Sequence, residues 1–101
     1  MSGSGHPGVK TGTKRTLFEN DLVRVIDLRL PPKAIEPEHS HPRFLVYALS
    51  AARVRVTSLP EGQVTEADVK PGDIFWKEPV THIGENIGDT ELHELIFEFK
   101  S

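Results

Sequence analysis

Residues 71–86 read Pro71-Gly72-Asp73-Ile74-Phe75-Trp76-Lys77-Glu78-Pro79-Val80-Thr81-His82-Ile83-Gly84-Glu85-Asn86. Pro71 fixes φ and Gly72 can adopt a positive φ, so the stretch opens on a tight turn. The apolar run after this turn predicts a strand that Pro79 interrupts, because proline cannot donate a ladder hydrogen bond. His82 and Asn86 follow at a spacing of four residues. The fold can be inferred from this pattern, which consists in order of a turn, a strand, a proline, a histidine and an asparagine.

Short alternating segments surround this stretch. Residues 23–30 and 53–57 alternate between the two faces of a strand and are rich in β-branched side chains, which favours strand over helix. The proline-rich segment 33–42 is expected to be a loop. In the last segment one face carries Leu92, Glu94, Ile96 and Glu98, and the other carries His93, Leu95, Phe97 and Phe99. No window has a helical period over ten residues, so we predict an all-β protein, a sandwich or barrel.

Chain length and composition limit the organisation. A chain of 101 residues has room for one hydrophobic core. The Gly- and Ser-rich start predicts a flexible tail over residues 1–14 and a single domain over residues 15–101. A domain of this size gains stability when it buries one face against a second copy of itself, so we expect a homodimer.

Charge and cysteine content exclude several classes of function. The net charge is −3 and no basic run exceeds Lys14-Arg15, which argues against nucleic acid as a partner. Because the chain has no cysteine, disulfides, thiolate zinc sites and cysteine nucleophiles are excluded. No apolar run approaches the ~18 residues of a membrane span, and no signal peptide is recognisable, so we expect a cytoplasmic protein without a membrane partner.

A pair of histidines suggests a metal site. His39 and His41 lie two residues apart, and on an extended segment both side chains project from the same face. Imidazole is a good ligand for Zn, Cu, Fe and Ni. A third histidine, His82, follows about forty residues later, after the Pro-Gly-Asp turn. Together they predict a three-histidine site that leaves coordination positions open for water or substrate.

These motifs resemble those of the cupin superfamily. His39-Ser40-His41 is similar to the first cupin motif, and residues 71–86 match the second closely, down to the His-x-x-x-Asn spacing. The resemblance covers roughly residues 22–99. It implies a double-stranded β-helix of six to eight strands, a jelly-roll-like small barrel, with His39, His41 and His82 as ligands of one divalent metal ion.

Two departures from the family pattern narrow the kind of metal site. Where the family usually carries a metal-binding glutamate, residues 43–46 offer Arg-Phe-Leu-Val, and Ser50-Ala51-Ala52 replaces the expected glycine. The resemblance is then to the three-histidine cupins such as thiol and diketone dioxygenases. Without the carboxylate, borderline ions are favoured: Fe²⁺ first, with Zn²⁺, Ni²⁺ or Cu²⁺ as alternatives. The competing interpretation is that the histidines are a relic that binds no metal.

Several other residues are candidates for the pocket around the metal. The candidate pocket residues are Phe44, Tyr47, Trp76, His93 and Phe97. For the aromatic residues a place in the core is the competing interpretation, and His93 can equally be a structural histidine. The glutamates near the histidines, Glu36, Glu38 and Glu85, can orient an imidazole, supply a substitute ligand, or simply be solvated. Asn86 is expected to form a turn.

Two functions of different classes follow. The first is a three-histidine mononuclear non-haem iron oxygenase acting on a small organic substrate, with a Zn²⁺ or Ni²⁺ isomerase or lyase as its redox-silent variant. The second is a non-catalytic cupin module that binds or senses a small ligand or metal. A scaffold whose barrel merely dimerises is a third. The sequence identifies no catalytic residue, and His93 is the only general-base candidate near the histidines, which favours the second function.

Overall fold

The structure, a computed structural model, describes residues 11–100, so most of the expected flexible tail lies outside the described residues. These residues form nine strands and no helix: β1 (Thr13–Glu19), β2 (Val23–Leu30), β3 (Ile35–His41), β4 (Phe44–Ala48), β5 (Ala52–Leu59), β6 (Gln63–Val69), β7 (Ile74–Lys77), β8 (Val80–Asn86) and β9 (Leu92–Phe99). The all-β prediction is confirmed. Since this part of the chain has no helix, it contains none that could cross a membrane.

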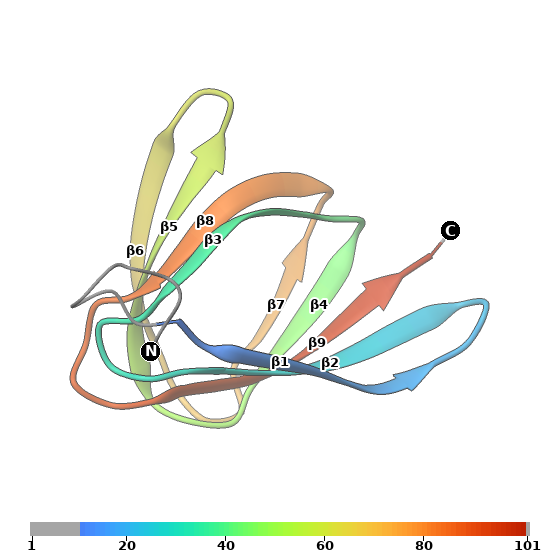
Figure 1. Cartoon of the computed structure of the whole chain (residues 1–101), viewed down its shortest axis with the longest axis horizontal. Coiled ribbons are helices and arrows are strands. Elements are labelled where there is room, and N and C mark those ends of the chain that lie inside the picture. Colours follow the sequence, from blue (N-terminus) through green and yellow to red (C-terminus); the bar gives the residue numbers. More distant parts are fainter. Residues whose placement is uncertain (1–10, 101) are drawn as a thin grey trace, which may run out of the picture.

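The strands form two sheets that face each other (Figure 1). One sheet has five strands in the order β1-β2-β9-β4-β7, and the other has four in the order β3-β8-β5-β6. All pairings are antiparallel, and strands far apart in sequence lie side by side, such as β2 with β9 and β3 with β8. This is the arrangement of a double-stranded β-helix.

The strand boundaries differ from the expectation in two places. β1 begins at Thr13, two residues before the predicted start of the domain. Residues 33–42 were expected to be a loop, but Ile35–His41 form strand β3. Pro37 is tolerated there because the register of β3 against β8 shifts between Glu36 and His39, so that proline stands where the ladder is already interrupted. The count of nine strands also exceeds the expected six to eight.

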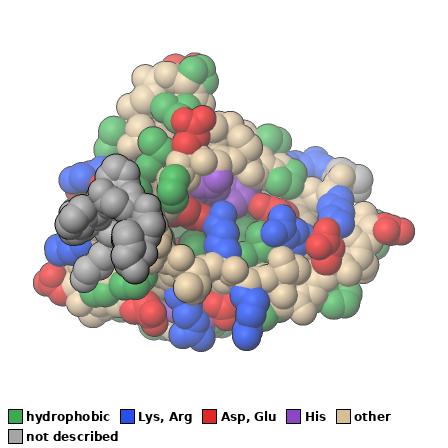
Figure 2. Space-filling model, in the orientation of Figure 1, with side chains coloured by type: hydrophobic (Ala, Val, Ile, Leu, Met, Phe, Trp, Pro, Cys, Tyr) green, Lys and Arg blue, Asp and Glu red, His purple; other side chains and the backbone are tan. Residues whose placement is uncertain are grey.

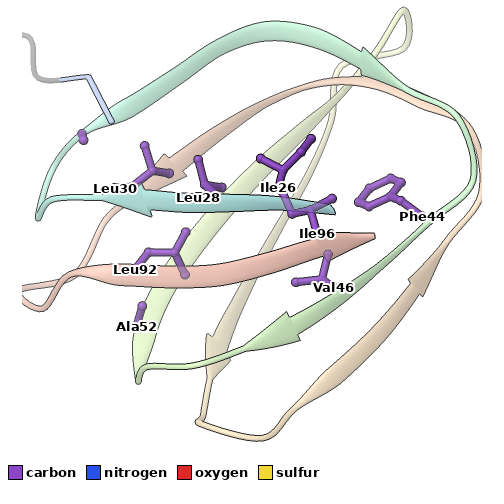
Figure 3. Close-up of a cluster of buried hydrophobic side chains, with 9 residues drawn as sticks. Ile26, Leu28, Leu30, Phe44, Val46, Ala52, Leu92 and Ile96 are labelled. Atoms are coloured by element: carbon purple, nitrogen blue, oxygen red, sulfur yellow. The ribbon is translucent and has the colours of Figure 1, made fainter. Parts of the chain in front are cut away.

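The core lies between the sheets and is supplied mainly by the five-stranded sheet (Figure 3). Each strand points alternate side chains inward. The buried cluster consists of Ile26, Leu28, Leu30, Ala34, Phe44, Val46, Ala52, Leu92 and Ile96. Cross-strand register aligns these residues, with Ile26 and Val46 on either side of Ile96. The inward face of β9 is therefore the one that carries Leu92 and Ile96.

The core does not fill the barrel. A cavity of about 390 Å³ remains between the sheets. Its walls are mostly aliphatic, and charged or histidine residues line it from both sheets: Glu36, His41, Lys77, Glu78, His82, Glu85 and Glu94. A mostly apolar chamber of this size with a few convergent polar groups is typical of a small-molecule site.

The side chain of Asn86 stabilises the turn that leads into β3 through hydrogen bonds. Its side-chain amide donates to the carbonyls of Leu30 (2.9 Å) and Thr90 (2.7 Å), and its Oδ1 accepts from the backbone of Gly88 (3.1 Å). Lys33 in the same turn has a φ of 69°, in the left-handed region that disfavours side chains, and its N–H donates to the carbonyl of Asn86. The bond with Gly88 forms the turn that was expected of Asn86, and the bond to Leu30 also ties Asn86 to the turn before β3.

Candidate metal centre

The histidines of the two motifs meet across one strand pair. His39 and His41 lie on β3, and His82 lies on β8 directly opposite His39 in the ladder. All three side chains point to the same side of the four-stranded sheet, and their ligand nitrogens lie within 4.8 Å of one another. Histidine side chains are visible at the centre of the face shown in Figure 2, with acidic side chains on either side of them. The predicted convergence of His39, His41 and His82 is therefore present.

Hydrogen bonds orient the imidazoles of His39 and His41 so that an unprotonated nitrogen of each points towards the middle of the histidine cluster. His39 Nδ1 lies 2.6 Å from the carbonyl oxygen of Pro37, and because a carbonyl only accepts, Nδ1 carries the proton. His41 Nδ1 lies 2.5 Å from Glu98 Oε2 and donates to that carboxylate in the same way. In each ring Nε2 is then the unprotonated nitrogen, the one that can bind a metal ion. In His39 this nitrogen accepts a hydrogen bond from His82 Nε2.

The spacing of the nitrogens fits one divalent ion. His39 Nε2 and His82 Nε2 are 2.9 Å apart. Imidazole nitrogens bound to one ion at roughly 2.1 Å lie roughly 3–4 Å from each other. The ring centroids are separated by 4.5 to 5.2 Å. The donor set is thus that of a divalent transition-metal site and needs only small side-chain adjustments to close on the ion.

Burial keeps two of the histidines neutral. It lowers the pKa of His82 to about 4, with a further contribution from positive charge on His39 and His41. Burial also lowers the pKa of His41, although the hydrogen bond to Glu98 opposes the shift. Neutral imidazole is the metal-binding form, so at neutral pH neither ring has to lose the extra proton of the charged form before it binds an ion.

A carboxylate lies beside the histidines, although the chain has no glutamate at residues 43–46, where the family pattern carries one. Glu36 Oε1 lies 3.5 Å from His39 Nε2, and Glu36 Oε2 lies 2.6 Å from Lys14 Nζ. Of the other flanking glutamates, Glu38 is exposed and Glu85 lies 3.6 Å from Arg55. Glu36 is therefore the flanking glutamate placed to contact a metal ion or a molecule bound to it.

Glu98 and Phe44 complete the surroundings of His41. The Phe44 ring lies against the His41 ring with centroids 4.3 Å apart. Phe44 belongs to residues 43–46, where the family pattern has its glutamate. The sequence did not reveal that Glu98 orients His41, since the two are 57 residues apart. The only available signal was that Glu98 shares a strand face with Leu92 and Ile96, where a charged side chain requires a partner.

The remaining candidate pocket residues lie elsewhere. Phe44 lines the cavity, whereas Tyr47, Trp76, His93 and Phe97 are not among its lining residues. By register all four share the outer face of the five-stranded sheet, opposite to the buried side chains. There Trp76 stacks on Phe99, and His93 Nε2 lies 3.2 Å from Asp27 Oδ2.

Fold and site define a double-stranded β-helix with a histidine cluster on its inner surface. The structure resembles a cupin domain from Bordetella pertussis Tohama I, with 22% identity, a TM-score of 0.84, and coverage of 95% of this chain and 100% of that chain. It also resembles a conserved protein with a double-stranded β-helix domain from Klebsiella pneumoniae (19% identity, TM-score 0.74, 94% and 80% covered). An RmlC-like cupin family protein from Methanocaldococcus jannaschii is similar too (19% identity, TM-score 0.72, 93% and 84% covered).

No family model matches the sequence, and no curated protein matches it. At these identities the resemblance is one of fold. The chain has the cupin fold, as its two motifs predicted.

Proposed function

We propose that this protein is a mononuclear metal enzyme that acts on a small, largely apolar organic molecule inside the barrel. The observation that supports this most is that three histidine ligands converge beside a cavity of about 390 Å³, which His41 and His82 line. His39, His41 and His82 would hold the ion, and Glu36 would contact it or its ligand. Three protein ligands leave coordination positions free, which is the arrangement of catalytic rather than structural sites.

Fe²⁺ is the metal we favour, with Zn²⁺, Ni²⁺ or Cu²⁺ as alternatives, because a site of imidazoles suits borderline ions. A bound Fe²⁺ would supply redox chemistry towards O₂, as in an oxygenase, and a redox-silent ion would supply Lewis-acid chemistry. The protein's own part is to orient the imidazoles through Pro37 and Glu98 and to surround the substrate with apolar walls.

Metal content tests this proposal directly. We expect about one divalent ion per chain in protein purified from iron- and zinc-supplemented cultures, measured by plasma mass spectrometry. Oxygen consumption with a panel of diketones, thiols and phenolic compounds then separates an oxygenase from a redox-silent enzyme or a non-catalytic binding module. Protein that contains no metal and does not take up added Fe²⁺ or Zn²⁺ would contradict the proposal.

The outer face of the five-stranded sheet is the surface that we expect to form a homodimer. Exposed apolar side chains from three of its strands share this face: Phe18, Tyr47, Ile74 and Trp76. Apolar patches of this kind mark protein interfaces. Light scattering is expected to give twice the mass of one chain, and Ile74→Lys to give that of one chain. Val64→Lys, an exposed apolar position on the other sheet, is the control. A parent protein with the mass of one chain would refute the dimer.

A further inference from the structure

Glu94 is a carboxyl group in apolar surroundings that the metal centre does not use. It lies on the inward face of β9 between Leu92 and Ile96, which are both buried. Across the ladder it is flanked by Leu28 on β2 and Ala48 on β4, also buried. Four aliphatic side chains thus surround its base, and the carboxyl group lines the cavity.

No hydrogen bond or ion pair links this carboxyl group to any of residues 11–100. Glu94 is half-buried, and a carboxyl group that loses part of its water shell without gaining a partner destabilises a fold. Glu98, on the same face of the same strand, shows the contrast, since it holds His41. An unpaired carboxyl group directed into a cavity is a typical feature of a functional site.

The charged groups around Glu94 favour its neutral form. Burial first, and then the charge of Glu36 on β3, raise the pKa of Glu94 to about 7, while Lys77 on β7 opposes the shift. His82 and Glu85 on β8 line the same cavity. At neutral pH a large fraction of Glu94 is therefore a carboxylic acid, which is a hydrogen-bond donor.

We propose that Glu94, as a carboxylic acid, is the donor that binds an oxygen atom of the ligand, and that the ligand is a neutral, mostly apolar molecule with an acceptor such as a carbonyl. The aliphatic walls fit the body of such a molecule. The carboxylate of Glu36 lines the same space and disfavours anions, and Lys77, the lysine among the lining residues, offsets this charge in part. This inference rests on the proposed function in one respect: the same ligand would also contact the metal ion.

Cyclohexanone is a suitable probe, since it is neutral and has one acceptor oxygen on an apolar ring. Its affinity is measured by ligand-observed NMR titration at about pH 6 and about pH 8.5, on either side of the pKa of Glu94. We expect binding at the higher pH to be roughly 2- to 10-fold weaker, which is the value of one neutral hydrogen bond. Cyclohexanecarboxylate, the anionic counterpart, is expected to bind metal-free protein more weakly than cyclohexanone at both pH values.

Two variants at position 94 separate hydrogen bonding from packing. Glu94→Gln keeps a donor that does not titrate, so its affinity is expected to be the same at both pH values. Glu94→Leu removes the donor in apolar surroundings, where the variant should fold, and is expected to bind roughly 2- to 10-fold more weakly than the parent at about pH 6. Glu38→Gln, an exposed glutamate on β3, should behave like the parent.

The proposal is overturned if cyclohexanone does not bind, if Glu94→Leu binds it as tightly as the parent, or if the parent's affinity does not change with pH. All titrations are run on chelator-treated and on Zn²⁺-loaded protein. The metal content of the same samples reports on the metal centre separately. Failure of the metal centre and failure of Glu94 as a donor therefore give different results.

Discussion

His82→Ala is expected to lower the affinity for Zn²⁺ or Fe²⁺ at least about 100-fold, because residues that only orient a ligand are already worth ~10- to 100-fold. His82 is the single ligand from β8, and its Nε2 lies 2.9 Å from that of His39. Its loss leaves two ligands on β3, which is too few to hold an ion against water. Competition with a chromophoric chelator measures the affinity.

The matched control is His93→Ala. His93 is also a half-buried histidine on a strand, but it lies on the outer face and pairs with Asp27. It should bind metal like the parent. Glu98→Leu is expected to have a smaller effect than His82→Ala, a loss of ~10- to 100-fold, since the acceptor that fixes the tautomer of His41 is removed. Equal affinities of the parent and His82→Ala would refute the three-histidine centre.

Asn86→Ala is expected to lower the free energy of unfolding by about 2–4 kcal/mol, because it removes three hydrogen bonds in a buried place. The carbonyls of Leu30 and Thr90 and the N–H of Gly88 would lose their side-chain partner. The turn at Lys33, which is already in a left-handed conformation, would lose support. Urea unfolding in the presence of a chelator measures the effect without metal linkage.

Asn20→Ala serves as the comparison. The Asn20 side chain also accepts two backbone hydrogen bonds in a turn, from Leu22 and Val23, but in an exposed place where water can replace it. Its expected cost is at most about 1 kcal/mol. Asn86→Asp should be as unstable as Asn86→Ala, because an ionised carboxylate cannot donate to the two carbonyls. If Asn86→Ala lowers the free energy of unfolding no more than Asn20→Ala does, the role of Asn86 in stabilising the turn is refuted.

Local chemistry made much of the fold predictable. The Pro-Gly-Asp turn, the interrupting Pro79 and the alternation of apolar and polar side chains depend on neighbours in sequence, and the structure has strands where these signals lie. His39 and His41 were placed correctly on one face because their spacing matches the period of an extended chain. The strand at β3 was missed because Pro37 lowers the local strand signal, and only its pairing with β8 stabilises it.

Glu94 and Glu98 of β9 show what could not be predicted from neighbouring residues, namely which face of the strand points inward. Residues 92–99 have two faces, and the one with Leu95, Phe97 and Phe99 is the more apolar, yet the face with Glu94 and Glu98 is directed inward. Alternation specifies that two faces exist, but their orientation follows from the pairing of β9 with β2 and β4, whose buried residues face the same side. Glu94 and Glu98 could therefore not be recognised as inward-facing residues from the sequence.

The three histidines could be identified from local features: their residue type, their spacing and the turn before His82. Their surroundings could be seen only in the folded chain: Glu98 behind His41, Glu36 beside His39, and Glu94 in the cavity. Glu94 and Glu98 lie far from His39 and His41 along the chain. Contacts such as the one from His41 to Glu98, across 57 residues, arise only when two sheets close on each other.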